Sequence, residues 1–154
     1  MEVSAQNFKQ TLSRFASGVT VVTMQEDESI HGITVSAFLS VSLEPPLVLV
    51  SIDKRAHSHA RLLLAEHYGV SILAQGQEHL SNHFAGRDDS VTPEFEKLSG
   101  FPVLKDALAQ LVCKRHQTID AGDHTLFLGY IQELNWRDAM PLTYFQGKYR
   151  QFVE

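Results

Sequence analysis

The sequence lacks the features that direct a protein to nucleic acid or to an oxidising compartment. It has 13 Lys and Arg against 18 Asp and Glu, a formal net charge of −5, and no long basic run. Duplex DNA and anionic membranes are bound through positive surfaces, so neither is expected as a partner. Cys113 is the single cysteine, which excludes an intrachain disulfide and suits a reducing compartment.

Long apolar runs and targeting segments are also missing. The longest dense apolar segment, Pro45 to Val50, is far shorter than the ~20 residues that span a bilayer. The N-terminus has no basic stretch followed by an apolar one, so no secretory signal is predicted. We expect a soluble, cytoplasmic protein with one domain, residues 1–154, because this length and 44% hydrophobic content suit one core.

The common nucleotide and hydrolase motifs are absent as well. There is no G-x-G-x-x-G, no G-x-x-x-x-G-K-[ST], no G-x-S-x-G and no C-x-x-C. A Rossmann site, a P-loop and a serine-hydrolase elbow therefore lack their signatures. Two histidine pairs, His57 with His59 and His79 with His83, have spacings seen in metal sites. Neither pair has a third ligand nearby, and we predict no metal site.

What is present predicts a mainly β protein. Helices are expected after the capping residues Ser4 and Ser58 and over Gln77–Ala85. Alternating and β-branched segments predict strands at Val19–Met24, Ile30–Phe38, Leu47–Asp53, Gly69–Leu73, Leu108–Ile119, His124–Trp136 and Leu142–Tyr149. The Leu47–Asp53 run is apolar enough to be buried on both faces. Short turns between most of these strands favour an antiparallel barrel over a doubly wound parallel sheet. The polar segment Arg87–Gly100 is expected to be a lid or an interface.

Three segments are candidates for ligand binding. Hydroxyls recur through Thr34–Ser42 on an extended chain, around the small Ala37, and either bind the edge of a flat polar ligand or face water. Asp53–Ser58 joins a buried strand to a helix, so its basic and hydroxyl groups either bind a phosphate or are simply solvated. His124 follows Gly122 in a turn at the expected barrel mouth, where it is either structural or functional.

Several stretches, in their order and spacing, resemble the flavin reductase domain of two-component flavin monooxygenases. They are Arg14–Thr23 (RFASGVTVVT), Gly32–Phe38 (GITVSAF), Ser40–Val48 (SVSLEPPLV) and Gly122–His124 (GDH). The C-terminal stretch Tyr144–Tyr149 (YFQGKY) fits the same family. Within that family the chain is similar to the reductase of 4-hydroxyphenylacetate 3-monooxygenase.

The resemblance implies an FMN-binding split β-barrel, a Greek-key-like antiparallel barrel with two to three flanking helices, that works as a homodimer. It implies reduction of FMN or FAD by NADH or NADPH and transfer of the reduced flavin to a flavin-dependent monooxygenase. His124 is the catalytic residue implied, beside the flavin face where nicotinamide stacks. The cofactor-binding residues implied are Thr34, Val35, Ser36, Ala37, Ser40, Ser51, Ile52, Asp53, Lys54, Ser58 and Tyr149, with Phe84 as a further neighbour of the cofactor or dimer interface.

Other functions remain open on the same barrel. A non-catalytic flavin-binding electron carrier would keep the cofactor without oxidising NADH directly. An oxidase like pyridoxamine-phosphate oxidase would need a basic cluster for the substrate phosphate, which the sparse Lys and Arg pattern disfavours. A haem-handling or purely structural barrel would have no affinity for flavin.

Overall fold

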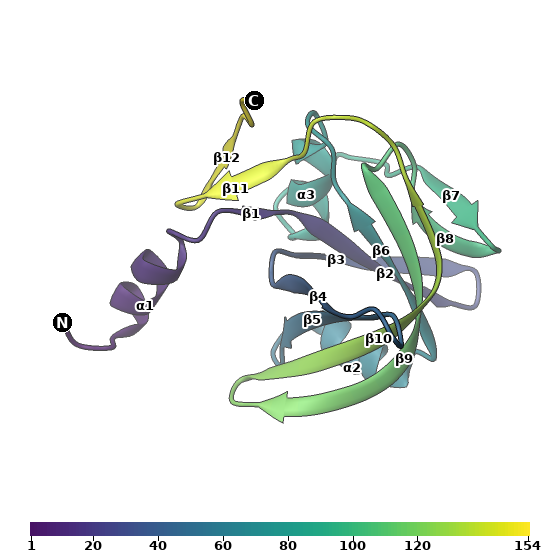
Figure 1. Cartoon of the computed structure of the whole chain (residues 1–154), viewed down its shortest axis with the longest axis horizontal. Helices are drawn as coiled ribbons and strands as arrows, with labels where there is room; N and C mark the ends of the chain where they lie inside the picture. The colour runs from purple at the N-terminus through teal and green to yellow at the C-terminus, as the bar shows by residue number, and fades with distance from the viewer.

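A computed structural model describes all residues 1–154, and a curved seven-stranded sheet forms its main body (Figure 1). The strand order is β3-β2-β6-β9-β10-β5-β4, and every neighbouring pair is antiparallel. These strands are β2 (Thr20–Glu26), β3 (Ser29–Val35), β4 (Phe38–Ser42), β5 (Leu47–Asp53), β6 (His67–Ile72), β9 (Ala109–Ala121) and β10 (His124–Trp136). The mainly β fold class with three helices is confirmed.

The remaining elements lie around this sheet. The helices are α1 (Ala5–Leu12), α2 (His57–Leu64) and α3 (Glu78–Phe84), and β7 (Phe95–Leu98) pairs with β8 (Phe101–Leu104). A second sheet contains β1 (Ser17–Gly18), β11 (Thr143–Phe145) and β12 (Lys148–Arg150). Figure 1 shows α1 extending away from the barrel and the β11–β12 hairpin projecting on the same side. Each of the three helices is too short and too polar to cross a membrane.

The split in the barrel lies where the chain passes from β3 to β4. These strands are consecutive in sequence and joined by Ser36 and Ala37, yet they form opposite edges of the seven-stranded sheet. The sheet therefore curls round, and the chain crosses the gap between its edges at this point, which we call the seam. The Phe38 N–H donates to the Ser36 carbonyl, and the Ser51 N–H donates to the Ala37 carbonyl, both at 3.0 Å. Edge strands leave main-chain groups unpaired on one side, so the seam is available to a ligand.

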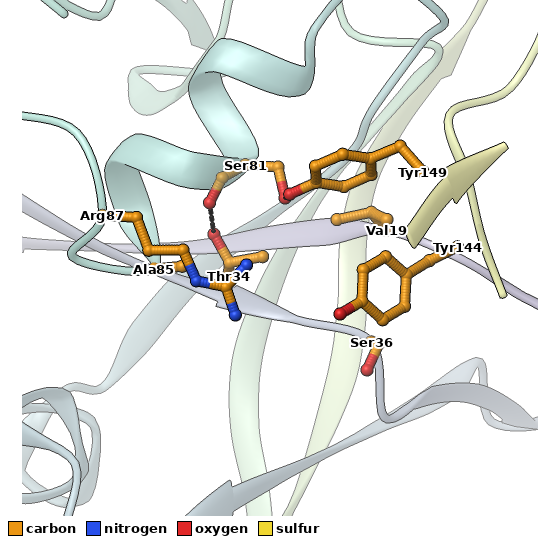
Figure 2. Close-up of a pocket in the computed structure, with 8 residues that line it drawn as sticks. All are labelled: Val19, Thr34, Ser36, Ser81, Ala85, Arg87, Tyr144 and Tyr149. Atoms are coloured by element: carbon orange, nitrogen blue, oxygen red, sulfur yellow. Dashed lines mark hydrogen bonds between the residues drawn. The ribbon is translucent and has the colours of Figure 1, made fainter. Parts of the chain in front are cut away.

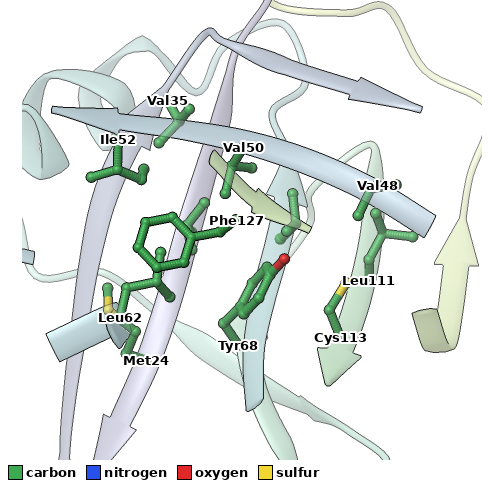
Figure 3. Packing of buried hydrophobic residues seen from close by; sticks show 12 residues of the cluster. Met24, Val35, Val48, Val50, Ile52, Leu62, Tyr68, Leu111, Cys113 and Phe127 are labelled. Carbon is green, nitrogen blue, oxygen red and sulfur yellow. The ribbon is translucent and has the colours of Figure 1, made fainter. Parts of the chain in front are cut away.

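The core fills the inside of the curved sheet (Figure 3). On β5, Val48, Val50 and Ile52 are buried, whereas the alternate residues are only half-buried. The prediction that this strand is buried on both faces is therefore wrong. An antiparallel sheet covers one face with the core and leaves the other near the surface, even when apolar residues occupy both.

The helix ends show where local sequence signals hold. Ser4 caps α1 as predicted, because its Oγ accepts a hydrogen bond from the Asn7 N–H at 3.1 Å. Ser58 does not cap α2: the N-cap is Ala56, and Ser58 lies buried within the first turn. The buried leucine of α2 is Leu62, while Leu64 is 86% exposed.

Two segments contain shorter strands and turns than the sequence indicated. The polar segment Arg87–Gly100 contains β7, which continues into β8 as a hairpin. The predicted final strand is two short strands, because Gln146 and Gly147 adopt positive φ angles of 54° and 73° and turn the chain back.

The buried hydroxyl of Tyr68 provides a stability prediction. Tyr68 is fully buried in the main core cluster, its Oη has no hydrogen-bond partner, and burial raises the pKa of the phenol. A buried hydroxyl without a partner costs about 1–3 kcal/mol. Tyr68→Phe is therefore expected to raise the free energy of unfolding by about 1 kcal/mol in urea titrations. Tyr130→Phe, at an exposed position, is the matched control, and a loss of stability in Tyr68→Phe would show that its hydroxyl has a partner.

Candidate functional site

Hydroxyl groups gather in a cavity of about 170 Å³ between the end of β3, α3 and the β11–β12 hairpin (Figure 2). Three predicted residues, Thr34, Ser36 and Tyr149, line it. The Thr34 Oγ1 donates to the Ser81 carbonyl at 2.7 Å, and the Tyr149 hydroxyl lies 2.6 Å from the Ser81 Oγ. The Tyr149 hydroxyl also donates to Asn82 Oδ1 at 3.1 Å. These bonds fix the C-terminal hairpin to α3 and so define one wall of the cavity.

His124 begins β10 and lies opposite Asp53 at the end of β5. The two residues line an open cleft that also includes Ser51 and is bounded by α1. The His124 Nδ1 is 2.8 Å from Asp123 Oδ1, and no other group of the chain binds its Nε2. This bond lowers the pKa of the Asp123 carboxyl. His124 is thus oriented through one ring nitrogen and offers the other to a ligand.

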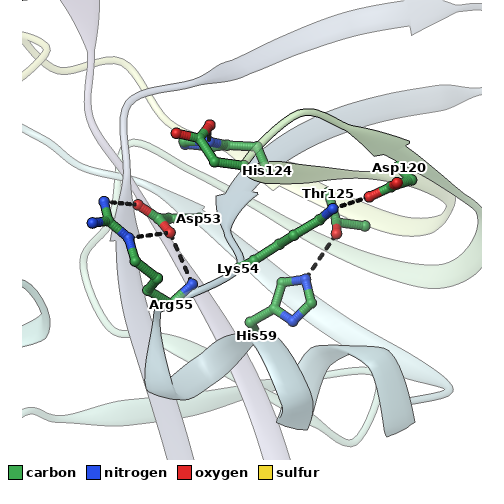
Figure 4. A network of polar contacts seen from close by, with 8 residues as sticks. Asp53, Lys54, Arg55, His59, Asp120, His124 and Thr125 are labelled. Carbon is green, nitrogen blue, oxygen red and sulfur yellow. Dashed lines mark hydrogen bonds and ion pairs between the residues drawn. The ribbon is translucent and has the colours of Figure 1, made fainter. Parts of the chain in front are cut away.

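The basic residues that precede α2 are bound to carboxylates (Figure 4). Arg55 Nη2 lies 2.9 Å from Asp53 Oδ2, and Arg55 Nε lies 3.2 Å from Asp53 Oδ1. These bonds, with the Arg55 N–H, hold the pKa of Asp53 well below its usual range. Lys54 forms an ion pair with Asp120. The predicted phosphate site at Lys54 is thus partly neutralised by acidic partners.

A groove across β3 connects the start of α2 with the end of α3. Ser58 and Thr34 line it, together with Phe84, Gly86 and His31. Phe84 lies directly against the strand: a Cβ atom at Gly32 would be 2.7 Å from the Phe84 ring. Thr34 also borders the smaller cavity, so the two hollows adjoin at this residue.

Of the remaining predicted residues, two have side chains in the core and two are exposed. Val35 is buried and Ile52 is only 1% exposed, and both belong to the core cluster. Their side chains therefore cannot line a ligand site, which leaves only their main-chain atoms. Ala37 is exposed at the seam, and Ser40 is exposed on β4 outside the cavities described above.

Two residues that the sequence interpretation missed also line the smaller cavity, Arg87 and Tyr144. Tyr144 could have been found from the hairpin, since β11 pairs it directly with Tyr149 and their rings pack edge to face at 5.4 Å. Arg87 follows α3 in an irregular segment, and no local pattern marks it.

These groups suit a ligand with a flat polar ring and an anionic tail. At the seam the two edge strands leave main-chain groups unpaired beside the small Ala37, and hydroxyls and Arg87 line the cavity next to the end of β3. A flavin has this combination of an aromatic ring that accepts and donates hydrogen bonds and a phosphate ester. The residues present therefore fit a flavin.

Comparison with known proteins agrees with this geometry. The model of the "Flavin reductase like domain" family matches residues 12–152. An NADH-dependent flavin reductase of a Rhodococcus species is 44% identical, over 97% of this chain and 87% of that protein. The reductase component of 4-hydroxyphenylacetate 3-monooxygenase from Thermus thermophilus is 42% identical, over 95% of each.

The solved structures give the same result. The flavin reductase PheA2 in its native state superposes with a TM-score of 0.96 at 42% identity, over 99% of this chain and 100% of that one. The fold, the family match and these relatives together place the chain in the flavin reductase family.

Proposed function

We propose that this protein reduces FMN or FAD with NADH or NADPH and releases the reduced flavin to a partner monooxygenase. The observation that carries the proposal is the seam. There, edge-strand main chain lies next to the cavity between β3, α3 and the β11–β12 hairpin, which the hydroxyls of Thr34 and Ser36 line. The family match and relatives named as NADH-dependent flavin reductases support it.

The chain's own residues bind and orient in this proposal. Flavin and NADH, when both are bound, supply a hydride transfer from nicotinamide C4 to flavin N5. Ser36 and the main chain at Ala37 hold the ring edge, and Ser51 is linked to them through its N–H bond to the Ala37 carbonyl. His124 orients the nicotinamide through its free Nε2. No side-chain nucleophile is needed, because the rate gain comes from alignment of two rings.

A steady-state assay tests the proposal. Purified protein is mixed with NADH or NADPH and with FMN, FAD or riboflavin, and oxidation of the nicotinamide is followed by absorbance. Flavin-dependent oxidation at catalytic protein concentration is the expected result. Flavin binding without oxidation would instead support the electron carrier, and a protein with no flavin affinity would overturn the proposal.

The proposed partner is a flavin-dependent monooxygenase, because one relative is itself the reductase component of 4-hydroxyphenylacetate 3-monooxygenase. Transfer of reduced flavin is tested by adding an oxygenase of that kind and measuring hydroxylated product. Product formation that requires both proteins and NADH supports this role.

We also propose that the protein is cytoplasmic, because NADH is available there and its single, buried Cys113 stays reduced in that compartment.

We further propose that two copies form a homodimer. Helix α1 buries none of its residues: Phe8 and Leu12 on it are 57% and 55% exposed, and Phe15, just beyond its end, is 82% exposed. Strand β4 also exposes Leu39 and Val41. Exposed apolar surface of this extent marks an interaction site. In a two-fold dimer the same surface of each copy contributes to the interface, so a second copy of the chain can cover these residues.

The dimer predicts a change of mass on substitution in α1. Phe8→Ser combined with Leu12→Ser is expected to shift the protein from dimer to monomer in light scattering at micromolar concentration, because the apolar contact is lost. Gln6→Ser, an exposed polar position of the same helix, should leave the dimer intact. A monomeric parent protein would contradict the proposal.

A further inference from the structure

The end of the long β9–β10 hairpin, which carries His124, has few neighbouring strands. Strand β6 pairs with β9 only as far as Lys114, so from His116 to Ala121 β9 pairs with β10 alone. On the other side, the pairing of β10 with β5 ends at His124 itself, opposite Asp53. The end of such a hairpin opens more easily than the centre of a sheet, so the place of His124 depends on what else holds it.

Three contacts from the segment that joins β5 to α2 hold this end of the hairpin (Figure 4). The Lys54 N–H donates to the Asp123 carbonyl at 2.9 Å, and the Lys54 ammonium forms an ion pair with Asp120. Asp120 is exposed, and ion pairs at the surface contribute little stability. The third contact comes from the first turn of α2, where the His59 Nε2 lies 2.8 Å from the Thr125 Oγ1.

The bond between His59 and Thr125 is shielded from water, unlike the ion pair. Thr125 is only 6% exposed, and His59 is the one partner of its hydroxyl. The His59 ring also packs edge to face against the buried Phe127, with ring centroids 5.9 Å apart. A buried hydroxyl that loses its only partner is costly, so this bond opposes movement of β10 away from α2.

Thr125 connects His59 to His124 because Thr125 and His124 are consecutive residues of β10. Their side chains point to opposite faces of the sheet, Thr125 towards His59 and His124 into the cleft bounded by α1 (Figure 4). His59 lines none of the three hollows described above. An effect of His59 on a ligand in the cleft must therefore pass through the main chain of β10.

From these contacts we propose that His59 is a positioning residue, which holds the start of β10 through Thr125 and so directs the ring of His124 towards the nicotinamide. The inference rests on the proposed function, in which His124 orients the nicotinamide. It extends the site to a helix residue outside the cleft, and it gives one member of the His57–His59 pair a role in the reaction.

Steady-state kinetics with NADH compare His59→Phe, His59→Gln and Thr125→Val. Phe keeps a ring against Phe127 but lacks Nε2, whereas the amide nitrogen of Gln can reach the place of Nε2 and donate to Thr125. His59→Phe and Thr125→Val are each expected to lower kcat/KM for NADH by about five- to tenfold, because His124 is then misplaced. His59→Gln should recover most of this loss. Flavin affinity, measured by fluorescence titration, should change less than about twofold in all three, since the loss is confined to the nicotinamide.

The same substitutions in a protein that already carries His124→Ala separate positioning from a merely structural role. A residue that acts only through His124 has no further effect once that ring is gone, so His59→Phe should leave kcat/KM of this protein unchanged. An equal loss in both backgrounds would overturn the inference, as would parent activity of His59→Phe alone. Arg61→Gln removes a contact of the same helix with Glu26 and is the matched control, expected to keep parent activity.

Hydrogen exchange distinguishes failure of the inference from failure of the proposed function, because it needs no turnover. Amides in residues 118–126 should exchange about fivefold faster in His59→Phe than in the parent protein, and at the parent rate in His59→Gln and Arg61→Gln. Unchanged exchange in His59→Phe would overturn the inference even in an active reductase. Faster exchange in a protein that does not oxidise NADH with any flavin would instead overturn the proposed function, while the hold of His59 on β10 would stand.

Discussion

Gly129→Ala is expected to destabilise the fold by about 3 kcal/mol, at the upper end of the usual cost of overpacking a core. Gly129 lies in β10, where a Cβ atom would sit 2.8 Å from both the Tyr68 Cζ and the Cys113 Cβ and closer still to the Tyr68 hydroxyl. Both neighbours are fully buried, so they have no space into which to move. In a domain of this size the loss corresponds to a fall in Tm of roughly 6–12 °C.

The position of the clash gives the prediction a control and a partial rescue. Gly18→Ala is the control, because a Cβ atom there meets nothing within 4 Å. Tyr68→Phe added to Gly129→Ala removes the hydroxyl but leaves Cζ in place, so part of the lost stability should return. Urea unfolding of all variants at one protein concentration measures these differences. Equal stability of Gly129→Ala and Gly18→Ala would show that β9 and β10 separate easily at this point.

Periodicity predicted the long hairpin well because its signals are local. The predicted strand at His124–Trp136 has the observed bounds of β10, and Gly122 makes the turn with a φ of 63°. The seam had no such signal. Ile30–Phe38 reads as one strand, and its division at Ser36 depends on which distant strands flank β3 and β4. Strand order is a non-local property, so alternation within one segment does not contain it.

The candidate site shows the same limit. The hydroxyl row was identified from its recurrence within one segment, and Ser58 from its place between a predicted strand and a predicted helix. The structure brings Thr34 and Ser58 to one groove. Local sequence could not show that Lys54 pairs with Asp120 across a long hairpin. Nor could it show that Arg87 meets a hairpin formed more than fifty residues later. Ion pairs between distant segments decide which basic groups remain free.

His124→Ala is expected to lower kcat/KM for NADH by up to about a hundredfold, the loss that small misplacement of reacting groups can cause. His124 offers its Nε2 to the cleft while Asp123 holds its Nδ1. Removal of the ring should disturb the nicotinamide more than the flavin. Flavin affinity, measured by fluorescence titration, should therefore change less than twofold.

Two conservative variants separate positioning through Nε2 from a merely structural role of the ring. The amide nitrogen of Gln can reach the place of Nε2, whereas that of Asn reaches only the place of Nδ1, so His124→Gln should recover activity that His124→Asn does not. His116→Ala, at an exposed position on β9, is the matched histidine control. If His124→Ala turns over NADH at the parent rate, or if Asn restores as much activity as Gln, Nε2 has no part in the reaction. The orientation of nicotinamide would then depend on the main chain of the seam and on the stacked rings alone.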